Sequence, residues 1–289
     1  MTSSWMIVAA VMFAAMGAFV KLGAQEFGTA ELAFYRSVIT LAAAVGLVAW
    51  HRGSVFSPFL KTHLLRSFLG MLTLVTYFYA LSQIPLATAM TLAQTSPLML
   101  AVLTVTFMGE RFSAWLLFAM VLGFAGVGLL LQPTFEAGKA QAAFIGLWSA
   151  LFASLAYLNV RTLGRAGEPA WRIVFWFSFV CTMFTAGWQL TTSTFHPVRL
   201  DNVWILVGIG VTGTLGQLMM TRAYHVGNTM VVSALSYSTL IFAAIAGLVL
   251  FNDAIPPLGW VGMAIIIVSG LIAVRVEKKE TIEEAGFEG

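Results

Sequence analysis

Charged residues are scarce in this 289-residue chain, and cysteine is almost absent. Asp, Glu, Lys and Arg make up 9% of the sequence, whereas soluble globular proteins carry about 25%, so the chain lacks the polar surface of a water-soluble fold. Hydrophobic residues account for 60%, which excludes a disordered chain because disorder requires low hydrophobicity. The single cysteine, Cys181, excludes an intrachain disulfide and a cysteine-built metal site. We therefore expect a protein of the lipid bilayer.

Long apolar runs are what the sequence has instead of charge. A transmembrane helix needs about 20 mostly apolar residues to cross roughly 30 Å of hydrocarbon, and Gly, Pro, Asn or a charge interrupts the runs where turns are expected. The sequence predicts an all-α integral membrane protein with ten transmembrane helices. The expected spans are 4–22, 30–50, 65–83, 87–108, 113–131, 143–161, 171–190, 203–224, 228–250 and 256–274.

The distribution of Lys and Arg predicts the orientation, because loops on the cytoplasmic side carry more of them. With the N-terminus in the cytoplasm, the inner side holds eleven of the 15 basic residues and the outer side holds four, which are Lys21, Arg36, Lys139 and Arg199. An even number of spans then places both termini in the cytoplasm. Residues 276–289 are expected to form a polar, solvated tail on that side.

A shift of 143 residues aligns the two halves of the chain, pairing Trp5 with Trp148 and Glu110 with Asp253. The predicted repeats are residues 1–132 and 143–275. Because each would hold five spans, the second must be inverted, as in many secondary transporters. The alternative is that two sets of apolar helices align loosely by chance.

Groups that carry enzyme chemistry are missing at membrane depth. None of the twelve acidic residues lies in the middle of a predicted span, and the four histidines fall in loops or at helix ends. The segment from Gly208 to Gly213 matches a dinucleotide-binding fingerprint, but it lies inside an apolar helix instead of after a strand. Small residues there are more typical of close helix packing. We expect no catalytic residue, no metal and no cofactor.

Four short segments resemble a known family. They are Glu31-Leu-Ala-Phe-Tyr-Arg36, Tyr79-Ala-Leu-Ser-Gln-Ile-Pro-Leu-Ala87, Thr95-Ser-Pro-Leu98 and Gly109-Glu-Arg111. On these, the chain resembles the EamA-type branch of the drug/metabolite transporter superfamily. The resemblance implies ten helices in two inverted repeats. The second half departs from the pattern, because Leu240 stands where Pro97 would recur.

Polar and aromatic residues at helical spacing supply a candidate binding site. Gln94 and Tyr237, which the 143-residue shift pairs, lead the set because an amide or phenol in mid-bilayer needs a partner. For the others, bonding within their own helix or filling of gaps is the competing interpretation. The candidates are Gln94, Tyr237, Tyr77, Gln217, Trp148, Tyr224 and Asn159.

Three further residues are candidates for gating. Arg36 lies about two turns into its helix, where it either extends to the headgroups or faces a cavity and binds a carboxylate. Glu31 is the one acid of the spans outside a clear loop, and we expect it either to stabilise the fold or to carry a proton. Pro97 is expected to kink its helix and act as a hinge.

These features predict a secondary transporter of the bacterial inner membrane that works by alternating access. The expected solute is a small organic metabolite, either an amino acid or a related zwitterionic or aromatic solute, moved by export or exchange. The resemblance leaves open uptake of S-adenosylmethionine, a vitamin or a similar solute. A membrane-embedded enzyme and a scaffold are the less favoured alternatives. The expected partners are the solute and the lipid bilayer, with no nucleic acid, and the protein is expected to be a monomer or homodimer.

Overall fold

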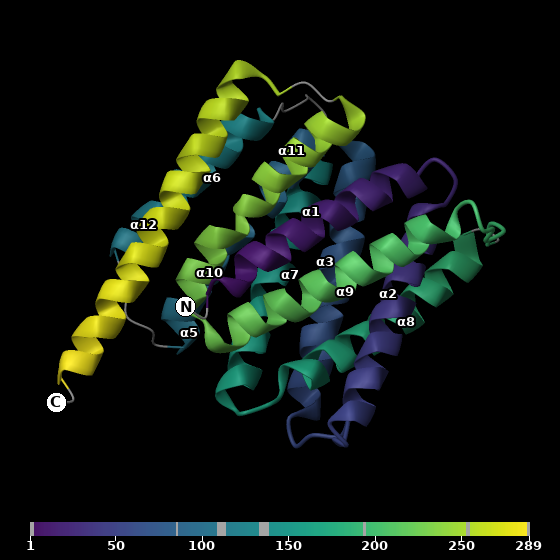
Figure 1. The fold of residues 1–289 in the computed structure, drawn as a ribbon, viewed down its shortest axis with the longest axis horizontal. Coiled ribbons are helices and arrows are strands. Elements are labelled where there is room, and N and C mark those ends of the chain that lie inside the picture. Colours follow the sequence, from purple (N-terminus) through teal and green to yellow (C-terminus); the bar gives the residue numbers. More distant parts are fainter. Residues whose placement is uncertain are drawn as a thin grey trace.

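The computed structural model describes residues 3–84, 86–108, 114–132, 139–192, 195–252 and 255–287, and these residues form helices and loops without a strand (Figure 1). The helices are α1 (Trp5–Gly23), α2 (Thr29–Trp50), α3 (Leu60–Gln83), α4 (Leu86–Ala93), α5 (Ser96–Met108), α6 (Ala114–Leu131), α7 (Ala140–Arg165), α8 (Ala170–Thr192), α9 (Val203–Val226), α10 (Thr229–Ser236), α11 (Ser238–Phe251) and α12 (Pro257–Phe287). The all-α class is thereby confirmed.

The helices follow the predicted spans, with two of the spans each divided into a pair of helices. The pairs are α4 with α5 and α10 with α11, so the twelve helices correspond to ten spans. Helix is the expected form because apolar surroundings require every backbone group to be paired within the segment. Two ends differ from the prediction: α3 begins at Leu60, and α12 continues to Phe287 through the segment expected to be a solvated tail.

The surface of the bundle is apolar enough for a bilayer. Within the described residues, eight helical stretches are long and apolar enough to cross a membrane, and α3 and the α4–α5 pair are not among them. Large apolar side chains stand outward, with Trp50 84% exposed, Phe107 72% and Val249 70%. Such exposure is costly in water and favourable in lipid. The chain is a multi-pass membrane protein.

Both helix breaks fall at the same place in their halves. α4 ends at Ala93 and α5 begins at Ser96, while α10 ends at Ser236 and α11 begins at Ser238. Pro97 accounts for the first break, because a proline lacks the N–H that would bond to the carbonyl of residue 93 and its ring clashes with that carbonyl. The predicted interruption near Pro97 is present.

The second break occurs without a proline. Leu240 has an N–H, but that N–H bonds to the carbonyl of Tyr237, at 3.1 Å, whereas in a continuous α-helix it would bond to the carbonyl of Ser236. A side chain assists at each break: Thr95 Oγ1 donates to the Leu92 carbonyl at 2.6 Å, and Ser238 Oγ donates to the Leu235 carbonyl at 2.7 Å. These two bonds are equivalent under the 143-residue shift.

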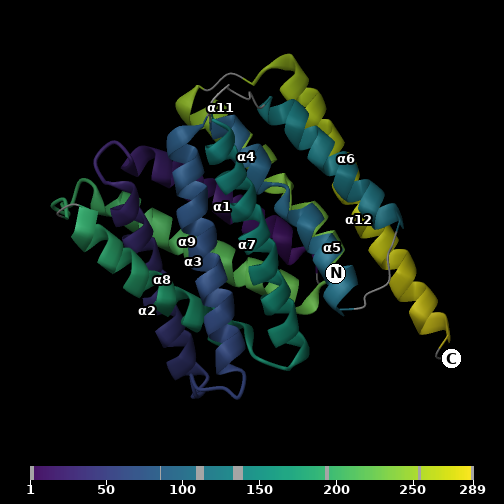
Figure 2. The same ribbon diagram turned by 180° about the vertical axis from the view of Figure 1, so that it is seen from behind.

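The same shift relates the helices and their packing. It converts the bounds of α3 into those of α9 and the bounds of α4 into those of α10. The helix α1 packs along α9 and α7 packs along α3, while α2 pairs with α8 and α6 with α12 (Figure 1 and Figure 2). Under exchange of the halves, the α1–α9 pair corresponds to the α7–α3 pair, and the α2–α8 and α6–α12 pairs each correspond to themselves, whereas the contacts of α10 with α5 and α6 have no equivalent of similar extent.

The pair α6–α12 forms one edge of the bundle, and its backbones touch. A Cβ placed on Gly262 would lie 2.5 Å from the carbonyl oxygen of Gly126 and 2.7 Å from the backbone nitrogen of Leu130. Without a hydrophobic driving force between helices in lipid, such close approach at small residues is a main source of association. The predicted packing role of the α9 glycines is seen too, since Gly208 and Gly216 lie against the rings of Phe19 and Phe13 of α1.

Candidate functional site

A small cavity lies at the junction of the two broken helices. Its volume is about 120 Å³, and five parts of the fold contribute to its wall. The lining residues are Met6 and Phe13 of α1, Gln94 and Ser96 at the first break, Tyr157 of α7, Met220 and Tyr224 of α9, and Ser236 and Thr239 at the second break. Because helix ends leave backbone groups without intrahelical partners, the two breaks place polar groups beside an otherwise apolar space.

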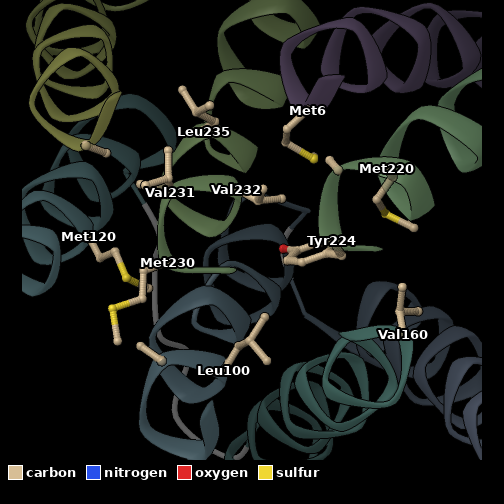
Figure 3. Close-up of a cluster of buried hydrophobic side chains, with 14 of the residues drawn as sticks. Met6, Leu100, Met120, Val160, Met220, Tyr224, Met230, Val231, Val232 and Leu235 are labelled. Carbon is tan, nitrogen blue, oxygen red and sulfur yellow. The ribbon is translucent and has the colours of Figure 1, made fainter. Parts of the chain in front are cut away.

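Two tyrosine rings form one side of this cavity. Tyr157 and Tyr224 are stacked, with ring centroids 4.6 Å apart and planes inclined by 12°. Tyr224 lies together with Met6 and Met220 in a buried cluster (Figure 3). A flat aromatic face beside Gln94 suits an organic solute that has both a planar or apolar part and hydrogen-bonding groups.

Of the seven residues predicted for the binding site, Gln94 and Tyr224 line the cavity. Gln217 is buried nearby in α9, where its Nε2 donates to Thr221 Oγ1 at 3.3 Å. Asn159 donates to the carbonyl of Leu155 in its own helix at 2.8 Å. A hydrogen bond within the residue's own helix is the alternative to solute binding that the sequence left open for these polar residues.

The other three candidates lie outside the cavity wall. Tyr237 is fully buried in the cluster between α6, α11 and α12, against Gly123, and its hydroxyl has no hydrogen-bond partner among the described residues. Trp148 is 42% exposed on α7 and contacts Phe144 and Phe152. Tyr77 packs with the small cluster around Ala80. Their roles in binding remain predictions.

The cavity also contains residues that the sequence reasoning missed. Tyr157, Met6 and Phe13 sit on helices that are apolar all round, so periodicity does not distinguish a cavity-facing side from a lipid-facing one. One signal was available for the polar wall, because the 143-residue shift that pairs Gln94 with Tyr237 pairs Ser96 with Thr239. Both of these hydroxyl residues line the cavity.

Two arginines are placed inside the bundle near Tyr157. Arg36 of α2 lies against Gly213 of α9, where an added Cβ would be 3.1 Å from its Nε. Arg66 of α3 is 2% exposed, and its guanidinium lies over the ring of Phe177 at 3.8 Å. From the sequence, Arg66 was counted with the basic residues of the inner side, at the start of the predicted span 65–83, whereas α3 begins at Leu60. Each arginine is close enough to interact electrostatically with Tyr157 and Cys181.

Glu31 is held by the loop that precedes α9. It is fully buried in the first turn of α2, where it accepts hydrogen bonds from the backbone N–H of His196 at 2.9 Å and from His196 Nδ1 at 2.8 Å. A carboxylate also interacts favourably with the N-terminal end of a helix. The contacts support the structural interpretation of Glu31, and proton transfer by this residue remains a prediction.

A second carboxylate joins helices at the other end of α2. Glu168, in the loop between α7 and α8, accepts bonds from Ser57 Oγ at 2.6 Å, His63 Nε2 at 3.0 Å and Arg172 Nη1 at 2.7 Å. Burial by itself would raise the pKa of Glu168, but the three hydrogen bonds to the ionised form outweigh it and hold the pKa below the usual value. His225 of α9 contacts the backbone carbonyl of Glu168 as well.

Comparison with known proteins gives relatives that are named as transporters. The chain is 31% identical over 276 residues to the pseudopaline exporter CntI of Pseudomonas aeruginosa, covering 94% of this chain and 95% of that protein. It is 24% identical to the riboflavin transporter of Vibrio cholerae, covering 97% and 95%. It is 23% identical to the S-adenosylmethionine uptake transporter of Rickettsia bellii, covering 95% and 94%.

The fold and the family model agree with these relatives. A crystal structure of another protein, 18% identical in sequence, superposes with a TM-score of 0.81 over 95% of this chain and 99% of that chain, which shows the same fold. The model of the EamA-like transporter family matches residues 1–132 and 140–275. The chain therefore belongs to the EamA-like transporter family of the drug/metabolite transporter superfamily.

Proposed function

We propose that the protein is a secondary transporter that moves a small organic metabolite across the bacterial inner membrane by alternating access. The observation that carries this proposal is the cavity enclosed where two broken helices meet. Discontinuous helices at the interface of two repeats are where transporters of several folds bind their solutes. The relatives support movement of a small molecule.

Two inverted five-helix repeats explain the symmetry of the bundle. The equivalent breaks, the equivalent bounds of α3 and α9, and the correspondence of the α1–α9 pair with the α7–α3 pair all support this arrangement. Five spans per repeat reverse the direction of the second copy, and rocking of one repeat against the other would open each side of the cavity in turn. At about 120 Å³ the cavity is smaller than the roughly 300–1,000 Å³ typical of ligand pockets, so a metabolite requires the helices around it to move apart.

Both termini are proposed to lie in the cytoplasm. When the buried Arg66 and the half-buried Arg36 are left out, ten basic residues remain on the inner side and three on the outer side. A fluorescent reporter fused after Gly289 is expected to fluoresce in the cytoplasm, and a fusion to a periplasm-dependent enzyme at the same point is expected to be inactive. The reverse pattern would contradict the proposed orientation.

Flux through the purified protein tests the function directly. A thermal-stability screen over amino acids, nucleosides and vitamins selects solutes, and proteoliposomes then measure their entry with and without protein. Gln94→Ala is expected to weaken transport by about 2- to 10-fold, because a hydrogen bond to a neutral group contributes roughly 0.5–1.5 kcal/mol. Gln141→Ala is the matched control, since Gln141 is an exposed glutamine of α7.

The outcomes of the flux experiment separate the proposed function from its alternatives. Solute that crosses unchanged only when protein is present supports a transporter, and solute that emerges chemically altered would indicate an enzyme. Among the residues that the structure describes, no cluster of His, Cys, Asp and Glu could hold a metal ion. Export or exchange is the proposed direction because the exporter is 31% identical and the uptake relative 23%. Equal transport by Gln94→Ala and wild type would place the binding site elsewhere.

A further inference from the structure

We infer that Arg36 and Arg66 form a carboxylate-binding subsite beside the cavity, and that the transported solute is an organic acid. This inference rests on the proposed function and specifies its substrate class. It differs from the sequence-based expectation of a zwitterionic or aromatic solute. That expectation assumed few charges inside the bundle, and the structure places Arg66 buried against α8 and Arg36 half-buried against α9.

Within the described part of the chain, neither guanidinium has an anion to neutralise it. The side chains of Arg36 and Arg66 make no hydrogen bond or ion pair with another described residue, and Arg66 Nε, Arg66 Nη1 and Arg36 Nε are buried without a partner. The nearest acid in sequence, Glu31, is occupied by His196. At the other end of the bundle, Glu168 is occupied by Ser57, His63 and Arg172.

The two positive charges converge on one region. Arg36 packs against Gly213 of α9, about one turn before Gly216, which contacts the cavity residue Phe13. Arg66 lies on α3, which packs along α7, the helix of the cavity residue Tyr157. The two arginines are close enough to act on each other as like charges. Burying one unpaired cation is already unfavourable, and a second cation nearby adds repulsion. An ionised residue within a membrane bundle is typically retained for a ligand or an ion pathway.

The chemistry of the site favours a carboxylate as the missing partner. Guanidinium groups bind carboxylates through two parallel hydrogen bonds, and they bind phosphate in a similar way. The stacked rings of Tyr157 and Tyr224 and the amide of Gln94 form a neutral wall for an organic body. A small organic acid satisfies both parts of the site, whereas an inorganic anion satisfies only the arginines.

Thermal stability of the dialysed protein in detergent tests the subsite without requiring transport. The probes are succinate, its half-amide succinamate and its diamide succinamide, together with L-glutamate and L-glutamine, and inorganic phosphate. We expect the melting temperature to rise with the number of carboxylates and to stay unchanged with succinamide. Phosphate that stabilises as strongly as succinate, or equal shifts with all three succinyl probes, would overturn the proposed substrate class.

Variants separate a ligand-binding role from a structural one. Arg66→Met and Arg36→Met are expected to weaken succinate binding at least 10-fold. Arg66→Lys is expected to have an intermediate effect, because lysine keeps the charge but lacks the two parallel N–H donors of the guanidinium. Without any probe, Arg66→Met is expected to be at least as stable as wild type, since it removes an unpaired buried charge. The matched control is Arg222→Met, because Arg222 also lies over a ring, that of Trp5, but is exposed. A lower melting temperature of dialysed Arg66→Met would overturn the inference in favour of a structural cation.

The flux assay tests this inference separately from the proposed function. Transport of a solute that is equally fast in wild type and both Met variants would remove the subsite from the pathway and leave the transporter intact. Carboxylate-dependent stabilisation with no flux of any solute would keep the subsite and overturn the transport function.

Discussion

Replacing Gly262 by leucine is expected to abolish the folded, monodisperse protein, and Gly262→Ala is expected to destabilise it by about 1–3 kcal/mol or more. The atoms that a Cβ would meet belong to the backbone of α6, at Gly126 and Leu130, so no side chain can rotate away. The two helices would have to separate along their contact, and in lipid little else holds them together.

Size-exclusion profiles and thermal unfolding in detergent measure this effect. Gly128→Leu serves as the control. Gly128 lies on α6, the helix that Gly262 contacts, and a Cβ there would have no neighbour within 4 Å. We expect the control to keep the wild-type profile. If Gly262→Leu elutes and melts like Gly128→Leu, then the contact between α6 and α12 does not stabilise the fold.

Removing the charge of Glu168 is expected to lower stability at neutral pH and to change how stability depends on pH. Hydrogen bonds to a charged group contribute roughly 1.5–3 kcal/mol, and Glu168 accepts three of them. Because its pKa is lowered in the folded protein, the stabilisation is complete above the unfolded value of 4.5 and is lost as the pH falls below 4.5 through the lower folded pKa.

A comparison of melting temperatures between pH 7 and pH 3 tests this expectation. Wild type should lose stability over the acidic part of that range, while Glu168→Gln should begin lower and fall less steeply. Glu26→Gln is the control, because Glu26 is exposed and its contact with Asn202 needs only an acceptor. Parallel pH profiles for wild type and Glu168→Gln would show that other groups govern the acid transition.

The helices were predictable from the sequence, because run length and interruption are encoded directly in composition. The orientation of each helix about its axis was not, since lipid and protein core are both apolar and leave no amphipathic pattern. For this reason Trp148, which was predicted for the site, does not line the cavity, and Tyr157 was missed although it lines the cavity. Gln94 was found because a deep amide is costly in lipid wherever it points.

Charged residues near helix ends show a second limit of prediction from the sequence. The predicted span of α3 starts at residue 65, so Arg66 was expected at the inner end of its helix, but the helix begins at Leu60 and carries Arg66 into the bundle. Neighbouring helices, and not the local sequence, decide whether such an arginine reaches water. The partners of Glu31 and Glu168 come from loops far away in sequence, which no local pattern predicts.

The presence of Pro97 in one half and Leu240 in the other makes the two helix breaks different in kind. The pyrrolidine ring fixes the first break covalently, so α4 and α5 stay separate in every state of the protein. The second break has no covalent cause, because Leu240 has the N–H that a continuous helix requires, although this N–H bonds to Tyr237 here. Bilayer thickness or a bound solute can therefore shift the length and straightness of α10–α11, while α4–α5 has no such freedom.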